Sequence, residues 1–265
     1  MTADLVKPNC QFFYKYKPAD HPDYIRSIIL DHQLYFPTPS QLNDPLEAKP
    51  QLISNSLPNL KMHFFRSWIA ANPGLSAERH ARAMAEIEAF TNTHGREFVL
   101  GLLQSDLHPI LDAHRIFSLA KRWDNMTNWV RYASNHTGVC LEFANEGPPF
   151  SSTYEVKYDG QVLLDITEPE QLDTTFFFHK SAGWHHEEEI RIVTHRGCPP
   201  TVQFDPSLLT RLILGKDVLD TLRLKILEWA RMRQPKLLVV QAAYDDYEQK
   251  LVQRVVQRLQ LVKSL

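Results

Sequence analysis

The chain has 265 residues, of which 43% are hydrophobic and 23% charged, so its composition is that of a globular protein and excludes a disordered chain. A formal net charge of −2 excludes an overall basic field of the kind that attracts nucleic acid. The three cysteines are widely spaced and form no C-x-x-C pair, which is typical of buried thiols in a reducing compartment and argues against a structural zinc site.

Targeting and membrane signals are not found in this sequence. The opening residues MTADLVKPNC lack the basic and then apolar pattern of a signal peptide, and no window approaches eighteen apolar residues. We therefore expect a cytoplasmic protein without a membrane partner. The 12 histidines are scattered, with His185-His186 as the only adjacent pair, so no bound metal is expected.

The first predicted elements are a strand, a helix and a second short strand. Residues 10–17 are aromatic and fit a strand, residues 22–32 have helical spacing, and residues 34–36 read as a brief strand closed by Pro37. Asn43-Asp44-Pro45 then predicts a turn, because Asn and Asp side chains can bond backbone groups two residues on. An ordinary loop is the alternative reading of that turn.

Residues 50–112 are predicted to form a helical insertion. A helix is expected around residues 61–71, and a second one follows Ser76, rich in Ala and Glu, with Gly95 as a break or kink. We expect residues 1–265 to form a single domain that carries this insertion. Such an insertion is suited to closing over a cleft.

The middle of the chain alternates strands with one short helix. Strands are predicted at residues 115–119, 139–143 and 154–158. Residues 124–133 predict a helix that begins at Asp124 or Asn125, either of which is a good N-cap. Trp129 and Tyr132 are three residues apart and share one face of that helix.

Residues 180–193, KSAGWHHEEEIRIV, carry the densest charge in the chain. Read as a strand, they place Glu187, Glu189 and Arg191 on one face, and Glu188 with two isoleucines on the other. One reading is a solvated face with a surface ion pair. Trp184, which leads into the carboxylates, favours a second reading, in which this strand forms one wall of a cleft.

The last third predicts a strand at residues 212–215, a helix at 217–232, a strong strand at 237–243 and an amphipathic closing helix at 247–263. The predicted architecture is therefore α+β, with a strand-rich mixed or antiparallel core, a helical insertion and C-terminal helices.

Short motifs follow one another through residues 12–215. In chain order they are Tyr14-Lys15-Tyr16, Leu34-Tyr35-Phe36, Asn43-Asp44-Pro45-x-Glu47, Trp129-x-x-Tyr132-Ala133, His136-x-Gly138-Val-Cys140, Val156-x-Tyr158 and Trp184-x-x-Glu187-x-Glu189-x-Arg191. This ordered set resembles a widespread bacterial family, the domain of unknown function numbered twenty-nine seventy-one, a relative of the AbiGi abortive-infection proteins. The resemblance implies a role in phage defence or as a toxin.

The first and last motifs are also similar to the His-type ADP-ribosyltransferases, which use NAD as substrate. That resemblance implies an ADP-ribosyltransferase-like fold. Lys15 stands where those enzymes carry His and would donate to ribose or phosphate oxygens. Glu189, or else Glu187, would be the catalytic carboxylate, with Arg191 holding its neighbour in place. A fixed carboxylate near the ribose would stabilise the oxocarbenium character that develops as nicotinamide leaves.

Further residues are candidates for substrate binding by the same resemblance. Ser118 would be the middle-motif residue at a strand edge, and Trp129 and Tyr132 would stack or line the cleft. The remaining candidates are Tyr14, Tyr16, Asn43, Asp44 and Trp184. Each also has a structural reading: Lys15 as a solvated strand residue, Trp129 and Tyr132 as core, and the Asn43-Asp44 pair as holders of their loop.

Three functions remain open from the sequence. The first is an NAD-consuming ADP-ribosyltransferase or NAD glycohydrolase that acts on an unknown acceptor. The second is a non-catalytic nucleotide- or partner-binding module of the same fold, because a lysine ammonium at position 15 cannot accept a hydrogen bond as histidine can. The third is a metal-dependent nuclease using Asp44, Glu187 and Glu189, which the slightly acidic chain disfavours.

Overall fold

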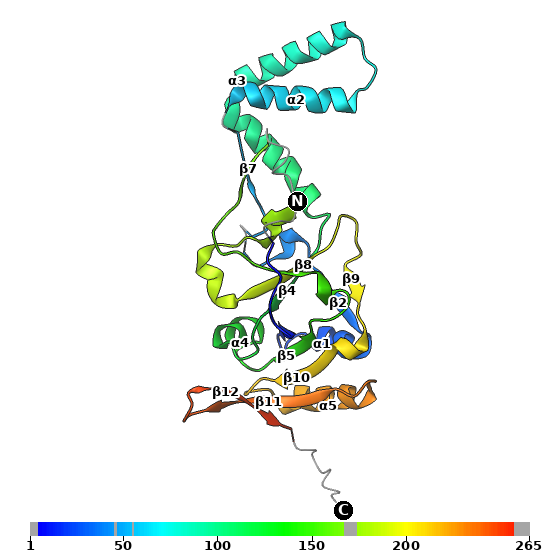
Figure 1. Cartoon of the computed structure of the whole chain (residues 1–265), viewed down its shortest axis with the longest axis vertical. Coiled ribbons are helices and arrows are strands. Elements are labelled where there is room, and N and C mark those ends of the chain that lie inside the picture. The colour runs from blue at the N-terminus through cyan, green and yellow to red at the C-terminus, as the bar shows by residue number, and fades with distance from the viewer. Residues whose placement is uncertain (1–4, 45–46, 55, 167–173, 257–265) are drawn as a thin grey trace, which may run out of the picture. The chain divides into compact units, whose positions relative to one another are not determined.

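The computed structural model describes residues 5–44, 47–54, 56–166 and 174–256, and Figure 1 shows it. These residues fall into two compact units. Unit 1 contains Thr38–His114 and Lys157–Ala182, and unit 2 contains Leu5–Pro37, Arg115–Val156 and the chain from Gly183 onward. The sequence had indicated only residues 50–112 as a separate part, so the assignment of residues 157–182 to unit 1 is new.

Unit 2 is built on an eight-stranded sheet with the order β12-β11-β10-β5-β1-β4-β8-β6. Among the strands that the structure describes in this sheet, β10 and β11 are the only neighbours that run parallel. A separate antiparallel pair joins β2 (Gln33–Tyr35) to β9 (Thr201–Gln203). The strands of the large sheet are β1 (Phe12–Lys17), β4 (Ile116–Ala120), β5 (Val139–Ala144), β6 (Thr153–Glu155), β8 (Glu189–Val193), β10 (Leu209–Leu214), β11 (Leu238–Asp245) and β12 (Lys250–Val255). The protein is therefore a mixed α+β structure with a large, mostly antiparallel sheet.

The two faces of this sheet differ in chemistry, and the strand register defines them. We call one the apolar face, because Phe13, Leu119, Leu141, Ile190 and Leu212 all belong to the main hydrophobic cluster of unit 2. Helices α1 (Pro22–Leu30) and α5 (Asp220–Met232) contribute to the same cluster. We call the other the polar face, and α4 (Met126–Tyr132) packs against it through a smaller cluster. Figure 1 shows α4 and α1 on opposite sides of the central strands.

The helices of unit 2 follow from their apolar spacing. Ile25, Ile28 and Ile29 of α1 recur at helical positions and are buried, as are Leu222, Ile226 and Ala230 of α5. In α4, the Asn125 side chain accepts from the backbone N–H of Asn128, which confirms Asn125 as the N-cap. Short 3₁₀ segments lie at Phe150–Ser152, Ala182–Glu187 and Pro206–Leu208.

Unit 1 contains a helical hairpin and one short parallel pair of strands. Helices α2 (Leu57–Ala71) and α3 (Ala77–Leu111) are capped by Ser56 and Ser76, and the pair joins β3 (Gln51–Ile53) to β7 (Leu163–Asp165). Short 3₁₀ segments lie at Pro39–Gln41 and Thr174–Phe178. The predicted break at Gly95 is confirmed by its φ of 77°, which interrupts α3, and Figure 1 shows that α3 bends along its length. Within the described part of the chain, no helix combines the length and apolar character needed to cross a bilayer.

The prediction of a closing helix at residues 247–263 is wrong for the residues that the structure describes. Residues 250–255 form β12, which pairs antiparallel with β11, and residues 257–263 lie outside the described range. Leu251 is buried opposite Tyr244, so the apolar residues of the segment are used by a hairpin. The apolar residues of this segment have helical spacing, but pairing with β11 stabilises the strand conformation instead.

The predicted strand at residues 180–193 is only partly correct. Residues Ala182–Glu187 form a 3₁₀ segment, Glu188 has a φ of 48°, and the strand begins at Glu189. A residue with positive φ interrupts the alternation of side chains, so Glu187 does not share a strand face with Glu189 through simple alternation. From Glu189 onward, the predicted alternation is confirmed.

Candidate functional site

The centre of the candidate site is a buried ion pair on β8. The Arg191 guanidinium donates from Nε to Glu189 Oε1 at 2.7 Å and from Nη2 to Oε2 at 3.0 Å. Arg191 is 0% and Glu189 is 5% exposed, so the reading of this face as a solvated surface is wrong. Such a bidentate pair fixes the geometry of the carboxylate, but removing both charges from water is costly.

A second buried carboxylate comes from the end of the 3₁₀ segment. Glu187 is 5% exposed, and its Oε1 accepts a short hydrogen bond from the Tyr132 hydroxyl of α4. The Asn128 side-chain amide of the same helix donates to the Glu187 backbone oxygen at 3.2 Å. Helix α4 therefore holds both the side chain and the backbone of Glu187.

Tyr14 of β1 shares the polar face with Glu189. Glu142 pairs with Tyr14, Tyr14 with Ala120, and Ala120 with Glu189, which makes one row across β5, β1, β4 and β8. Residues directly opposite each other in a ladder point to the same side of the sheet. Neighbouring strands are about 4.8 Å apart, so Tyr14 and Glu189 are separated by about 10 Å across the small side chain of Ala120.

The Tyr14 hydroxyl is held in its protonated form. It donates to Glu142 Oε2 at 3.2 Å, and Glu142 also accepts from the Thr210 hydroxyl at 2.8 Å. Burial, and then the charge of Glu142, raise the pKa of Tyr14 above its usual value. Tyr14 therefore acts as a hydrogen-bond donor at neutral pH and not as an acid that gives up its proton.

Lys15 lies on the opposite face, which corrects the expected arrangement. Lys15 pairs with Leu141 of the apolar cluster, and its Nζ lies 4.7 Å from the centre of the Phe117 ring. The Nζ also donates to the backbone oxygen of Ser118 at 2.6 Å. A sugar held between Lys15 and Glu189 would need both side chains on one side of the sheet, and the register places them on different sides.

Ser118 lies on the polar face, because it is the register partner of Arg191 on the adjacent strand. Its position is compatible with the middle-motif role. Tyr16 lies on the same face and is nearly buried, with its hydroxyl donating to the backbone oxygen of Arg122 at 2.9 Å. The structure therefore brings together Tyr14, Tyr16, Ser118, Tyr132, Glu187, Glu189 and Arg191 and leaves Lys15 out.

Trp129 belongs to the core of unit 2. It is 0% exposed, and its ring meets Tyr16 edge-on at 5.3 Å and stacks on His136 at 5.7 Å between ring centres. Its Nε1 donates to the Trp123 backbone oxygen at 2.7 Å. The structural reading of Trp129 as core, which the sequence left open, is the one that the packing supports.

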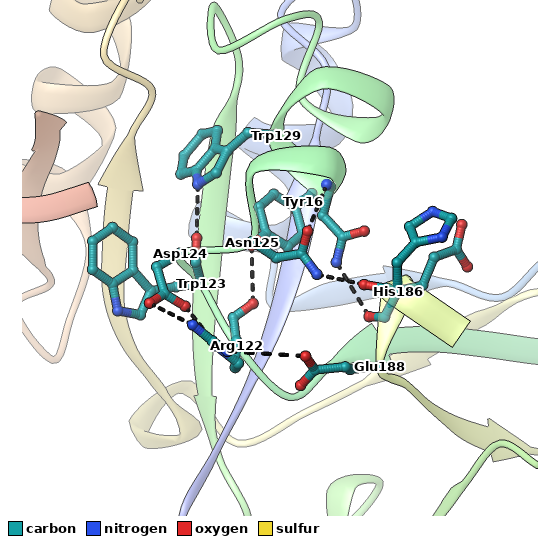
Figure 2. Close-up of polar contacts among 10 residues, drawn as sticks. Tyr16, Arg122, Trp123, Asp124, Asn125, Trp129, His186 and Glu188 are labelled. Carbon is teal, nitrogen blue, oxygen red and sulfur yellow. Dashed lines mark hydrogen bonds and ion pairs between the residues drawn. The ribbon is translucent and has the colours of Figure 1, made fainter. Parts of the chain in front are cut away.

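A polar network next to α4 positions the segment that carries Glu187 (Figure 2). Arg122 makes two hydrogen bonds to Asp124, at 2.9 and 3.0 Å, and its guanidinium lies 4.0 Å from Glu188. The hydrogen bonds from Arg122, and then its positive charge, lower the pKa of Asp124 below its usual value. The Asn125 side chain donates to the His186 backbone oxygen at 2.6 Å. Asn125 therefore both caps α4 and holds the backbone of the segment that carries Glu187.

Trp184 lies at the start of the same segment. The Arg131 guanidinium is 4.7 Å from the centre of the Trp184 ring, a cation–π contact, and the His186 ring is 6.3 Å away. Trp184 is partly exposed. Trp184 therefore remains partly accessible, unlike Trp129.

The candidates Asn43 and Asp44 belong to unit 1, as does a buried pair that sequence reasoning missed. Asp44 is buried, and the Glu47 backbone N–H donates to the Asp44 backbone oxygen at 3.1 Å. Lys180 Nζ lies 3.2 Å from Glu47 Oε1, and both side chains are almost completely buried. Glu47 belongs to the Asn-Asp-Pro-x-Glu motif, and this motif was the sequence feature that could have identified Glu47 as a candidate.

Glu142 was also missed. It is the single charge in the strand VCLEFA, which was the available signal for a buried carboxylate. Among the residues that the structure describes, no group of three or more His, Cys, Asp or Glu side chains is arranged to hold a metal ion.

Comparisons with known proteins give no relative for this chain. No protein-family model, no curated protein and no solved structure matches it. The function is therefore proposed from the polar face together with the motifs of the sequence.

Proposed function

We propose that this protein binds NAD on the polar face and breaks its bond to nicotinamide. The observation that carries the proposal is the burial of two carboxylates and a guanidinium: Glu187, Glu189 and Arg191 are each at most 5% exposed. A buried ion pair adds little to stability compared with apolar packing, so its presence favours a functional role. The resemblance of the Glu-x-Glu motif to ADP-ribosyltransferases names the substrate.

The proposed roles follow from the hydrogen bonds. Arg191 engages both oxygens of Glu189, so Glu189 is the carboxylate that is held in place. Glu187, which accepts from Tyr132, is then proposed as the carboxylate that stabilises the ribose as it gains positive charge. The bond from ribose C1′ to the nicotinamide nitrogen breaks, and nicotinamide keeps the electron pair. Water or an acceptor hydroxyl adds to C1′ and releases one proton.

The test is release of nicotinamide from NAD by the purified protein, with and without cell lysate as a source of acceptor. Glu187→Gln is expected to lower the rate at least about 100-fold, because it removes transition-state charge stabilisation. Glu97→Gln, at an exposed position of α3, is the matched control and should keep the full rate. No nicotinamide release by the wild-type protein under either condition would defeat the proposal.

The AbiGi resemblance adds a cellular expectation. If the protein is a defence or toxin effector, its expression should lower cellular NAD, and expression of the Glu187→Gln variant should not. Equal NAD levels in the two strains would show that the protein does not consume NAD in cells, even if it does so in vitro.

A non-catalytic nucleotide-binding module is the second candidate, and two observations favour it. Both oxygens of Glu189 are already engaged by Arg191, and Lys15 lies on the opposite face of the sheet from Glu189. Under this proposal, NAD and ADP-ribose raise the unfolding temperature while no nicotinamide is released. Turnover by the wild-type protein would decide against it.

A further inference from the structure

A cavity of about 340 Å³ lies in unit 2, apart from the residues of the proposed NAD site. Its lining residues come from the turn after β10, the end of β11 and the facing part of β12, and they are Lys216, Gln241, Ala242, Ala243, Tyr244 and Arg254. The volume is within the range of small-molecule sites, which is about 300 to 1,000 Å³. The cavity is therefore large enough for a small metabolite.

The cavity lies at the carboxyl ends of the only parallel pair of strands in the large sheet as described. Strands β10 and β11 run parallel and are joined through α5, and Leu214, the last residue of β10, pairs with Gln241. Lys216 follows directly after β10. In α/β units, ligands bind outside the carboxyl ends of parallel strands, where loops diverge and leave space.

The charge of the lining is one-sided. Lys216 and Arg254 are its charged residues, and no carboxylate is among the six. Gln241 is the register partner of Arg254, so the two side chains lie next to each other on the same side of the sheet. Lys216 is ion-paired with Asp217, which lies outside the lining, and Arg254 adds a second cation, so the lining itself carries net positive charge, which favours an anionic ligand.

Arg223 of α5 supplies a separate indication. Its Nη2 donates to Gln241 Oε1, which brings its guanidinium to a residue of the lining. Its Nε is buried and has no acceptor among the described residues. Arg223 is not itself a lining residue, so it contributes positive charge behind Gln241 and makes no direct contact with the cavity.

We propose that this cavity binds a phosphate-bearing small molecule, with Lys216 and Arg254 as the residues that contact the phosphate. Arginine matches phosphate oxygens with a planar fork of donors, and lysine supplies a point charge. Lys216 forms an ion pair with Asp217 in the structure, and both side chains are substantially exposed. A phosphate would compete with Asp217 for this ammonium, so Asp217→Asn should tighten binding.

The experiment is calorimetric titration of the full chain with pyrophosphate, ADP and adenosine. Pyrophosphate and ADP are expected to bind and adenosine is not, and binding should weaken as salt is raised. Arg254→Gln and Lys216→Gln should each weaken binding about tenfold or more. Lys250→Gln changes an exposed cation of the same strand β12 outside the lining, so it serves as the control and should bind normally.

The outcomes also separate this site from the proposed NAD site. Glu187→Gln and Glu189→Gln should leave pyrophosphate binding unchanged. The inference is overturned if neither pyrophosphate nor ADP binds at millimolar concentration, if adenosine binds as well as ADP, or if Arg254→Gln binds as tightly as the wild type. Binding that is lost in Glu187→Gln and retained in Arg254→Gln would place the anion on the polar face and likewise overturn it.

Discussion

The two faces of the eight-stranded sheet are built from the same strands, but one buries apolar side chains and the other buries charged side chains. On the apolar face, Phe13, Leu141 and Ile190 belong to one hydrophobic cluster, and each such side chain contributes about 1.5 to 3 kcal/mol by leaving water. On the polar face, Glu142, Glu189 and Arg191 are as deeply buried. Burial of charge gives no comparable gain. The comparison teaches that deep burial marks stability on one face and a candidate function on the other.

The largest expected effect comes from breaking the buried pair on the polar face. Arg191→Met should lower the free energy of unfolding by about 3 to 5 kcal/mol, because it leaves the Glu189 carboxylate buried without its partner. Ile190→Val, one residue away on the apolar face, should cost only about 0.5 to 1.5 kcal/mol. Urea unfolding measures both. Equal losses in the two variants would show that the faces do not differ as described.

Replacing a lysine that points to the apolar side should raise the free energy of unfolding, in contrast to Arg191→Met. Lys17 is on the same side as Phe13, and burial lowers its pKa to about 8 from 10.5. A lowered pKa in the folded protein means that the charged form costs stability, in full below pH 8 and not at all above about pH 10.5. Lys17→Met should therefore stabilise the protein at pH 7 by an amount on the order of 1 to 3 kcal/mol.

The pH dependence checks the cause. Wild-type stability should rise between pH 8 and pH 10.5 through this group, and Lys17→Met should remove that part of the rise. Lys250→Met, at an exposed lysine of β12, is the control and should leave it in place. A gain at pH 7 that persists unchanged at pH 10.5 would point to packing instead of charge.

Removal of the α4 helix cap on the polar face should give the next largest change in the free energy of unfolding. Asn125→Ala should cost about 1 to 2 kcal/mol, since Asn125 both caps α4 and bonds the His186 backbone. Asp205→Ala removes the cap of a 3₁₀ segment elsewhere in unit 2 and should cost about half as much or less. Chemical unfolding compares the two. Limited proteolysis of Asn125→Ala should also cut within residues 182–187, and resistance there would argue against the shared role.

The smallest effect tests the hairpin that extends the sheet. Gln249 has a φ of 49° in the turn between β11 and β12. Glycine adopts that conformation without strain, so Gln249→Gly should raise stability by a few tenths of a kcal/mol. In the helix that the sequence suggested, glycine would instead cost about 0.5 to 1 kcal/mol. The sign of the change in thermal unfolding decides between the two structures.

Local signals were enough to predict many elements. The aromatic strand β1 and the break at Gly95 each depend on a few neighbouring residues and were predicted correctly. The cap of α4 was narrowed to Asp124 or Asn125, and the structure selects Asn125. The carboxylate segment was harder, because the positive φ of Glu188 moved Glu187 out of the strand. Glu187 nevertheless lies beside Tyr132, a contact that joins positions 55 residues apart and follows from no local pattern.

The sequence by itself determined the α+β composition, the apolar alternation of the strands and the Glu-x-Glu-x-Arg motif, whose charged residues prove to be buried. Only the tertiary structure decided that Tyr14, and not Lys15, lies on the same side of the sheet as Glu189. The side on which a side chain lies depends on the register between strands, and β1 reaches β8 only through β4. A shift of one residue in any of these pairings would exchange the two faces, and the pairings join segments that are far apart in the chain.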